Sequence, residues 1–242
     1  TQPASNVVFT VASGDTGEAT VSPATLTFTT GNWNATQQVT VTGVDDSVDD
    51  GDQDTTVTIA VDDDNSDNAF DGVADQTVTA TTTDDDTAAF TLSTTTASVT
   101  EAGSTATFTV VLDTQPLSDV VFTVVSADTS EATVSTPTLT FTSGSWNVPQ
   151  SVTVTGVDDT IDDGDQDTTV TIAVDDDNSD NAFDGLADQT VTATTTDNDT
   201  AGYTLSGTTV TVTEAGSTAT FTVVLDTQPT SNVVLTVSSA DT

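Results

Sequence analysis

Apolar and polar residues alternate in short runs along most of this chain. The run 106–112 reads Ala-Thr-Phe-Thr-Val-Val-Leu, and the runs 151–155 and 168–173 follow a similar pattern. Such alternation predicts strands that bury one face and expose the other. Turn-forming Gly, Pro, Asp and Ser separate the runs, and no stretch has the period of an amphipathic helix. About seven or more short strands in succession predict an all-β protein built of immunoglobulin-like β-sandwich domains.

The whole pattern returns after 113 residues without insertion or deletion, as from Trp33 to Trp146. Between 48–86 and 161–199 only three positions differ. A period of this length matches one β-sandwich domain and is too long for a solenoid repeat. The chain therefore divides into three segments with different contents. These are a sandwich that lacks its first strands, a complete sandwich, and the opening strands of a third repeat, at residues 1–87, 88–200 and 201–242.

Composition removes several classes of function. The chain has 39 acidic residues and no Lys, Arg, His or Cys, so its formal net charge is −39. Such charge can indicate disorder, but the acids gather between the apolar runs, which favours a folded β protein. Nucleic-acid binding needs Lys and Arg, and a membrane span needs about 18 consecutive apolar residues, so we expect neither. Disulfides and Cys-based zinc sites are excluded, and most catalytic nucleophiles and bases are absent, so we expect no enzyme.

The acidic residues mark a candidate metal site. Residues 156–167 connect two predicted strands and contain six Asp, and residues 43–54 repeat this loop in the first copy. If several strand ends meet at one pole of the sandwich, carboxylates from distant segments share a small volume. Calcium takes six to eight oxygen ligands, largely from Asp and Glu, whereas softer metals prefer His and Cys. The alternative interpretation is a solvated acidic surface, as in salt-adapted proteins.

The order of three short motifs resembles the Calx-β pattern. These motifs are Val99-Thr100-Glu101-Ala102-Gly103, then Val157-Asp158-Asp159 followed by Asp163, then Asp197-Asn198-Asp199. Calx-β domains recur in sodium–calcium exchangers, integrin β4 and very long bacterial surface adhesins. In the exchanger domains, calcium is held by the turn Glu, a mid-domain Asp, the paired Asp with a following acid, and the terminal Asp run.

The resemblance implies a set of calcium ligands in each copy. In the second copy the implied ligands are Glu101, Asp128, Asp158, Asp159, Asp163, Asp197, Asn198 and Asp199. In the first copy, which lacks the turn Glu, they are Asp15, Asp45, Asp46, Asp50, Asp84, Asp85 and Asp86. Two positions depart from the family pattern, because Asp163 replaces a Glu and Asn198 replaces an Asp. The Asn carbonyl can still bind calcium, but the second copy is expected to hold one ion fewer.

These observations predict a calcium-stabilised structural repeat that acts as a rigid spacer. The resemblance places it in a secreted bacterial surface adhesin or an extracellular filament. We expect its partners to be the neighbouring repeats of the same chain, and other copies joined in a filament by strand addition. The alternative is an extracellular module that binds carbohydrate or another ligand through loops such as 175–186. The near identity of the two copies favours the spacer, because the loops of a binding module should vary.

Overall fold

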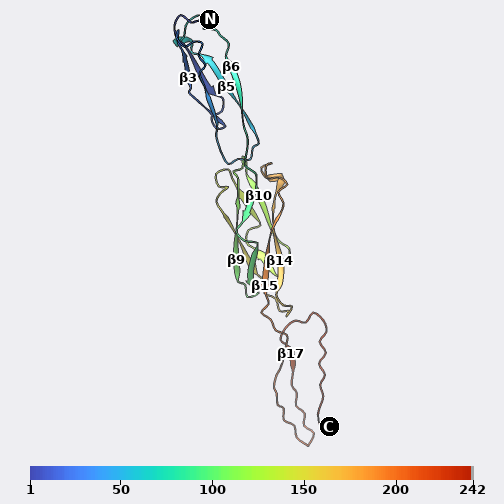
Figure 1. Cartoon of the computed structure of the whole chain (residues 1–242). Helices are drawn as coiled ribbons and strands as arrows, with labels where there is room; N and C mark the ends of the chain where they lie inside the picture. The colour runs from blue at the N-terminus through green and yellow to red at the C-terminus, as the bar shows by residue number, and fades with distance from the viewer. Residues whose placement is uncertain (241–242) are drawn as a thin grey trace. The chain divides into compact units, whose positions relative to one another are not determined.

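The computed structural model describes residues 1–240 and is all-β. It contains two compact units. Unit 1 comprises Thr1–Ala88 together with Thr114–Pro116, and unit 2 comprises Ala89–Asp113 and the residues from Leu117 onward. Each sheet is confined to the residues before 88, to residues 88–200, or to the residues after 200 (Figure 1).

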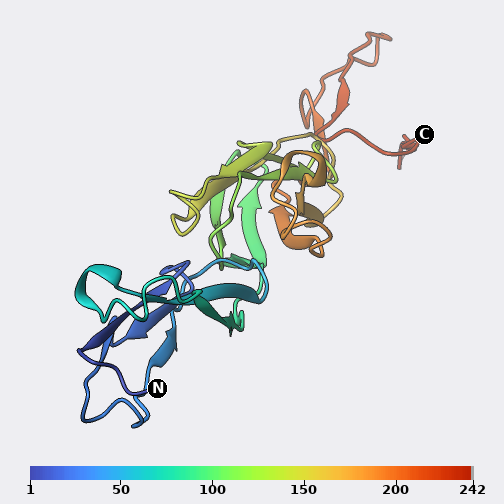
Figure 2. The same cartoon turned by 90° about the horizontal axis from the view of Figure 1, so that it is seen from above.

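Unit 2 contains a complete immunoglobulin-like sandwich of two sheets (Figures 1 and 2). One sheet has the order β12-β10-β14-β15-β8 and the other has the order β11-β13-β9-β7. Neighbouring strands are antiparallel except for β15 and β8, which run parallel. The bounds of the nine strands are β7 (Phe90–Leu92), β8 (Thr96–Thr100), β9 (Thr105–Leu112), β10 (Val120–Ser126), β11 (Ala132–Val134), β12 (Thr138–Phe141), β13 (Gln150–Gly156), β14 (Gln166–Val174) and β15 (Gln189–Thr196).

The core of unit 2 lies between these two sheets. In β12, Leu139 and Phe141 are buried while the intervening Thr residues are exposed, as period-two alternation predicts. Phe122 stands at the centre of an aromatic cluster, with Phe90 at 4.7 Å and Phe141 at 5.9 Å between ring centroids. Each such side chain contributes roughly 1.5–3 kcal/mol when it leaves water. The alternating Thr and apolar residues thus form a two-layer core without a helix.

Unit 1 contains part of the same sandwich. Its sheets have the orders β3-β1-β5-β6 and β2-β4, which correspond at an offset of 113 residues to β12-β10-β14-β15 and β11-β13. No strand of this unit corresponds to β7, β8 or β9. Its apolar residues are more exposed as a result: Val41 is 41% exposed and Val78 is 53% exposed, whereas Val154 and Val191 are fully buried. The strand bounds are β1 (Val7–Ser13), β2 (Ala19–Ser22), β3 (Thr25–Phe28), β4 (Thr40–Gly43), β5 (Gln53–Val61) and β6 (Gln76–Thr82).

Residues 201–240 belong to unit 2 and form one strand pair, β16 (Tyr203–Leu205) with β17 (Val223–Leu225). The pairing repeats that of β7 with β9, since Tyr203 lies opposite Leu225 as Phe90 lies opposite Leu112. Figure 1 draws most of this segment as extended loops. The three-segment division made from the sequence stays a prediction, because the structure groups the third segment with the second.

The only helical elements among residues 1–240 are two short 3-10 turns, η1 (Asp63–Asn65) and η2 (Asp176–Asn178). They lie in equivalent loops, after β5 and after β14. Neither is long enough to cross a membrane, and the described residues contain no other helix that could.

Candidate metal centre

The ends of four segments meet at one end of the unit 2 sandwich. Because β15 and β8 run parallel with Thr196 opposite Thr100, the residues that follow both strands leave the sheet side by side. The N–H of Glu101 donates to the carbonyl of Thr196 at 3.2 Å. The N–H of Val157 donates to the carbonyl of Glu131 at 2.8 Å, which joins the loop after β13 to the turn before β11. Backbone pairing therefore brings four acidic segments together.

The first carboxylate group consists of Glu101, Asp197 and Asp199, whose oxygens lie within 4.8 Å of one another. Glu101 is only 2% exposed, and its Oε2 accepts the N–H of Asn198 at 3.1 Å. Burial raises the pKa of Glu101. The hydrogen bond from Asn198 lowers this pKa, and the charges of the nearby carboxylates raise it further. Burial and the Asp197 charge likewise raise the pKa of Asp199. The group therefore holds negative charge that no protein cation neutralises.

The second carboxylate group consists of Glu131, Asp159 and Asp163, also within 4.8 Å of one another. Burial raises the pKa of Glu131, and the charges of Asp163 and Asp128 add to it. Glu131 was not among the ligands predicted from the sequence. The signal that could have identified it is the scarcity of glutamate. The chain has only four, at two positions of the repeat, Glu18 with Glu131 and Glu101 with Glu214.

One aspartate in each unit organises the acidic loops. Asp197 accepts the N–H groups of Gly164 and Asp199, both at 2.7 Å. Asp84 makes the equivalent bonds in unit 1, to the N–H groups of Gly51 at 2.7 Å and Asp86 at 2.9 Å. These N–H groups lower the pKa of both carboxyls, and those of Asp199 and Asp86 contribute most. The loops thus keep their shape through hydrogen bonds within the protein.

Some predicted ligands lie outside the two groups. Asp128 accepts the N–H of Ser130 at 2.9 Å, and Asp15 accepts that of Gly17 at 2.8 Å. Asp158 accepts a hydrogen bond from the amide nitrogen of Asn198 at 3.2 Å, so the amide nitrogen and not the carbonyl of this residue faces the paired Asp. Calcium binding by these residues stays a prediction.

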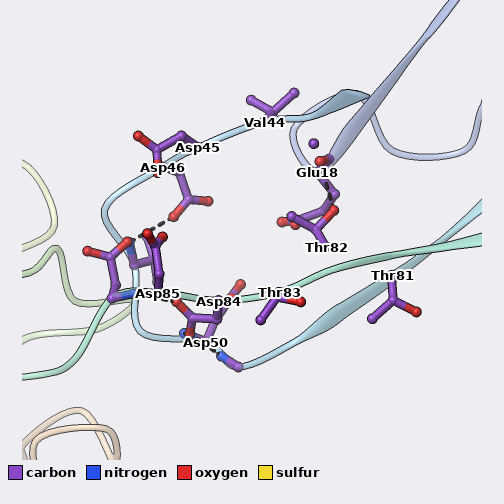
Figure 3. A pocket seen from close by; sticks show the side chains of 14 residues that line it. Glu18, Val44, Asp45, Asp46, Asp50, Thr81, Thr82, Thr83, Asp84 and Asp85 are labelled. Atoms are coloured by element: carbon purple, nitrogen blue, oxygen red, sulfur yellow. Dashed lines mark hydrogen bonds between the residues drawn. The ribbon is translucent and has the colours of Figure 1, made fainter. Parts of the chain in front are cut away.

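In unit 1 all but one of the predicted acids line an open cleft of about 350 Å³. Figure 3 shows side chains of the 43–54 loop close to those that follow β6, with Asp50 beside Asp84. Glu18 lines the cleft, whereas Asp15 does not. Burial raises the pKa of Glu18 and of Asp86, and neighbouring carboxylates add to both shifts. The predicted ligands among the lining residues are Asp45, Asp46, Asp50, Asp84, Asp85 and Asp86. Among residues 1–240, the tight groups of three carboxylates are the two in unit 2.

The other acidic loop, after β14, has a structural carboxylate. Asp180 is buried and accepts the N–H groups of Ser118 at 2.7 Å and Ala182 at 3.1 Å. Burial alone would raise the pKa of Asp180, but these N–H groups together outweigh it and the pKa is lowered. Asp67 makes equivalent bonds in unit 1, to the N–H groups of Ser5 and Ala69. Asp180 therefore ties the loop before β10 to the loop after β14.

We predict that Asp180→Ala lowers the free energy of unfolding of unit 2 by about 2 kcal/mol, because it leaves the part-buried N–H groups of Ser118 and Ala182 without their charged acceptor. Asp177→Ala, in the same loop but exposed, is the matched control and should change stability little. Urea unfolding followed by tryptophan fluorescence measures both. Equal midpoints for the two variants would contradict a structural role for Asp180.

Comparison with known proteins finds no matching family model and no curated protein sequence that matches. Among solved structures, the S-layer protein SbsC is 20% identical, with a TM-score of 0.37, over 81% of this chain and 21% of that one. Domains 4 and 5 of SbsC are 21% identical, with a TM-score of 0.36, over 78% of this chain and 70% of that one. SSP-19 of Caenorhabditis elegans, an MSP-domain protein like family member, is 16% identical, with a TM-score of 0.33, over 44% of this chain and 99% of that one.

These similarities are too distant to assign a family. The chain spans about a fifth of the length of the larger SbsC structure. The likeness of the acidic motifs to Calx-β domains has no matching family model behind it. What the geometry itself supports is an all-β tandem protein whose acidic groups could hold a metal ion.

Proposed function

We propose that this chain is a calcium-stabilised structural repeat of an extracellular protein, and that each sandwich acts as a rigid spacer. The observation that carries the proposal is the convergence of two carboxylate groups at one end of a complete sandwich, in a chain without Lys, Arg or His. A spacer needs a stable fold and a stiff connection to the next repeat. The carboxylates at this end of the sandwich could bind an ion that stabilises the fold and stiffens the connection.

The donor set favours calcium over other metals. All six side chains in the two groups are carboxylates, and the chain has no His or Cys to bind zinc or copper. Magnesium demands near-ideal octahedral geometry, whereas calcium accepts six to eight oxygens in irregular arrangements. Extracellular calcium modules work at weak affinities, which suits carboxylates that also make hydrogen bonds within the protein.

The acidic loops also contact the segment that leaves the sandwich. The N–H of Ala201 donates to Asp162 at 2.6 Å, and in unit 1 the N–H of Ala88 donates to Asp49 at 2.7 Å. Asp199 of the first carboxylate group lies only two residues before Ala201. An ion held by this group would therefore restrict the segment that leads to the next repeat, which supports the proposed stiffening.

The test is Glu101→Gln, whose effect on stability should change sign with calcium. The folded protein holds the charged Glu101 poorly, because burial raises its pKa. Its favourable contribution is complete below the unfolded pKa of about 4.5 and is lost as the pH rises through the folded pKa. At pH 7 with chelator, the neutral Gln should therefore raise the Tm. With calcium it should lower the Tm, since one anionic ligand is lost and binding weakens by on the order of tenfold.

Thermal unfolding of wild type and Glu101→Gln, each with calcium and with chelator, gives the four values needed. Glu131→Gln should behave in the same way. Asp177→Asn, which lies outside both groups, should leave the Tm unchanged both with calcium and with chelator. A Glu101→Gln effect of the same sign in both conditions would count against calcium binding and favour a solvated acidic surface.

A further inference from the structure

Four aspartates of this chain are followed directly by glycine. Two of these Asp–Gly pairs, Asp50–Gly51 and Asp163–Gly164, lie in the acidic loops after β4 and β13. The other two, Asp71–Gly72 and Asp184–Gly185, lie in the loops after β5 and β14. Asp–Gly is the sequence in which aspartate isomerises most readily, because glycine has no side chain to shield its backbone nitrogen. The surroundings of each nitrogen therefore decide which pairs react.

The four pairs are alike in their access to water and in their glycine conformation. All eight residues are exposed. The φ angles of the four glycines lie between 74° and 78°. A Cβ built on any of these glycines would have no atom within 4 Å apart from its chain neighbours. Exposure, glycine φ and crowding thus do not distinguish one pair from another.

In the acidic loops, a carboxylate from a distant segment holds the glycine N–H. The N–H of Gly164 donates to Oδ2 of Asp197 at 2.7 Å. In unit 1 the N–H of Gly51 donates to Oδ2 of Asp84, also at 2.7 Å. A hydrogen bond to an ionised acceptor is strong, and the negative charge beside the nitrogen opposes loss of its proton. Both effects make this nitrogen a poor nucleophile.

In the loop after β14, the glycine is the third residue of a β-turn. The N–H of Leu186 donates to the carbonyl of Phe183 at 3.3 Å, and unit 1 has the same turn at 70–73 with a bond of 3.1 Å. This bond joins the first and fourth residues and does not use the N–H of the third. Within residues 1–240, the N–H groups of Gly72 and Gly185 have no acceptor. Their nitrogens are therefore free to react.

We propose that Asp184–Gly185 and Asp71–Gly72 are sites of spontaneous isoaspartate formation, and that Asp197 and Asp84 protect the same pair in the acidic loops. Water is the only co-reactant, so no second protein or cofactor is needed. The proposal does not depend on calcium. It gives Asp197 and Asp84 a second role besides keeping the loops in shape.

The modification passes through a succinimide. The nitrogen of Gly185 loses its proton to a solvent base and attacks Cγ of Asp184, which forms a new N–Cγ bond. One oxygen of that carboxyl group takes up protons from solvent and leaves as water. A second water molecule then opens the ring. Cleavage of the N–Cγ bond restores aspartate, whereas cleavage between the nitrogen and the original main-chain carbonyl carbon gives isoaspartate, with no net change in mass.

Isoaspartate at Asp184 lengthens the main chain by one atom within the turn. The extra atom enters directly after Phe183, which is 1% exposed and belongs to the core of unit 2. The same change at Asp163 would instead disturb the second carboxylate group. Protection by Asp197 therefore confines the modification to the loop at the other end of β14, away from the candidate metal centre.

The test follows all four pairs in the folded 242-residue chain. The protein is kept for several weeks at neutral pH with chelator, in water enriched in heavy oxygen, which each succinimide event incorporates. Peptic fragments are then sequenced by electron-transfer mass spectrometry, which distinguishes aspartate from isoaspartate. The two copies are read separately, because Val48 replaces Ile161 and Val73 replaces Leu186. Since every sample contains chelator, failure of calcium binding would leave the result unchanged.

We expect isoaspartate to form about tenfold faster or more at Asp184 and Asp71 than at Asp163 and Asp50, because a hydrogen bond to a charged group is worth at least the free energy of a tenfold change in rate. In guanidinium chloride the protecting hydrogen bonds are lost, so this difference should largely disappear. Equal rates at the four sites of the folded chain would overturn the proposal. An undiminished difference in denaturant would do so too, since neighbouring residues and not the fold would then cause it.

Asp197→Ala tests the protecting residue directly. Without this acceptor, Asp163 should isomerise about tenfold faster. Asp50 is the control in the same molecule and should keep its rate, because Asp84 still holds its glycine. The rate at Asp184 should also stay the same, which shows that unit 2 remains folded. An unchanged rate at Asp163 would refute protection by Asp197.

A second pair of variants leaves the Asp197 contact in place. Asp184→Asn and Asp163→Asn change one side-chain atom each, and their deamidation passes through the same succinimide. We expect the Asp184→Asn chain to deamidate about tenfold faster than the Asp163→Asn chain, for the same reason as above. The gain in mass on deamidation measures both rates. Equal rates would contradict the proposal even if Asp197→Ala does not fold.

Discussion

Removal of calcium is expected to cause the largest loss of stability in this protein. One ion present at about 100 times its dissociation constant stabilises the folded state by roughly 2.7 kcal/mol. If each of the two carboxylate groups of unit 2 holds an ion, chelation should cost this unit about 5 kcal/mol. For a domain of about 100 residues, each kcal/mol lowers the Tm by roughly 4–8 °C. Thermal unfolding with calcium and with chelator measures the loss.

The physical reason is repulsion between carboxylates. Two of them about 4 Å apart repel by about 1 kcal/mol even in bulk water, and the oxygens of each group lie within 4.8 Å. Burial strengthens the effect at Glu101 and Glu131, whose pKa values are both raised. Acidification with chelator should therefore restore part of the lost stability as these groups are protonated, before much lower pH protonates Asp180 and Asp197, whose pKa values are lowered.

Sodium chloride at matched ionic strength is the control for this prediction. A salt-adapted acidic surface gains stability from screening by any salt, whereas a built site responds to micromolar or millimolar calcium at constant ionic strength. Magnesium provides a second comparison, because its stricter geometry suits these groups poorly. Equal midpoints with calcium and with sodium chloride would leave the solvated surface as the better interpretation.

Replacement of Gly156 by alanine is expected to destabilise unit 2 by about 3 kcal/mol or more. A Cβ there would lie 2.2 Å from the carbonyl oxygen and 2.8 Å from the carbonyl carbon of Thr100, and Cβ atoms do not approach backbone so closely. The strand that carries Thr100 must move, which disturbs its pairing with β15 and the position of Glu101. The same change should therefore also weaken calcium binding.

Gly43→Ala is the matched control, since Gly43 holds the same position in unit 1. Its Cβ meets only Thr82 at 3.6 Å, an ordinary contact, so we expect a change within about 0.5 kcal/mol. Trp33 and Trp146 place one fluorescent reporter in each unit, and Trp33→Phe isolates the signal of unit 2. Urea unfolding then measures the two variants separately. Equal destabilisation by both would show that the close approach at Gly156 is not what decides stability.

Much of the fold could be predicted from local patterns. Alternation of Thr with Val, Phe and Leu predicted strands, and the structure confirms an all-β fold with buried and exposed residues alternating, as in β12. The physical reason is that a strand exposes alternate residues to opposite environments, so its burial pattern is written in the sequence of the strand itself. The repeat could also be predicted from the sequence, because near-identical sequences form the same strand orders in unit 1 as in the corresponding part of unit 2.

The sequence named some of the acids that the structure brings together, and metal binding by them stays a prediction. The loops around Asp159 and Asp163, and around Asp197 and Asp199, do meet carboxylates from other segments. Their position at strand ends follows from sequence, since strand breaks and acids coincide there. The resemblance named Asp128, whereas the structure places Glu131, three residues further along the same turn, in a carboxylate group. Local pattern alone does not distinguish them, because the direction of a side chain in a turn depends on the backbone conformation of that turn.

The sequence by itself determined the strands, the repeat and the absence of any cation to neutralise the acids. Only the tertiary structure decided which acids stand together. The parallel pairing of β8 with β15 joins segments almost 100 residues apart and sets Glu101 against Asp197. The tertiary structure also places Asp180 outside both carboxylate groups, where it accepts backbone N–H groups. Such choices depend on which distant strand ends become neighbours, and that is settled by packing of the whole core, which no local stretch of sequence records.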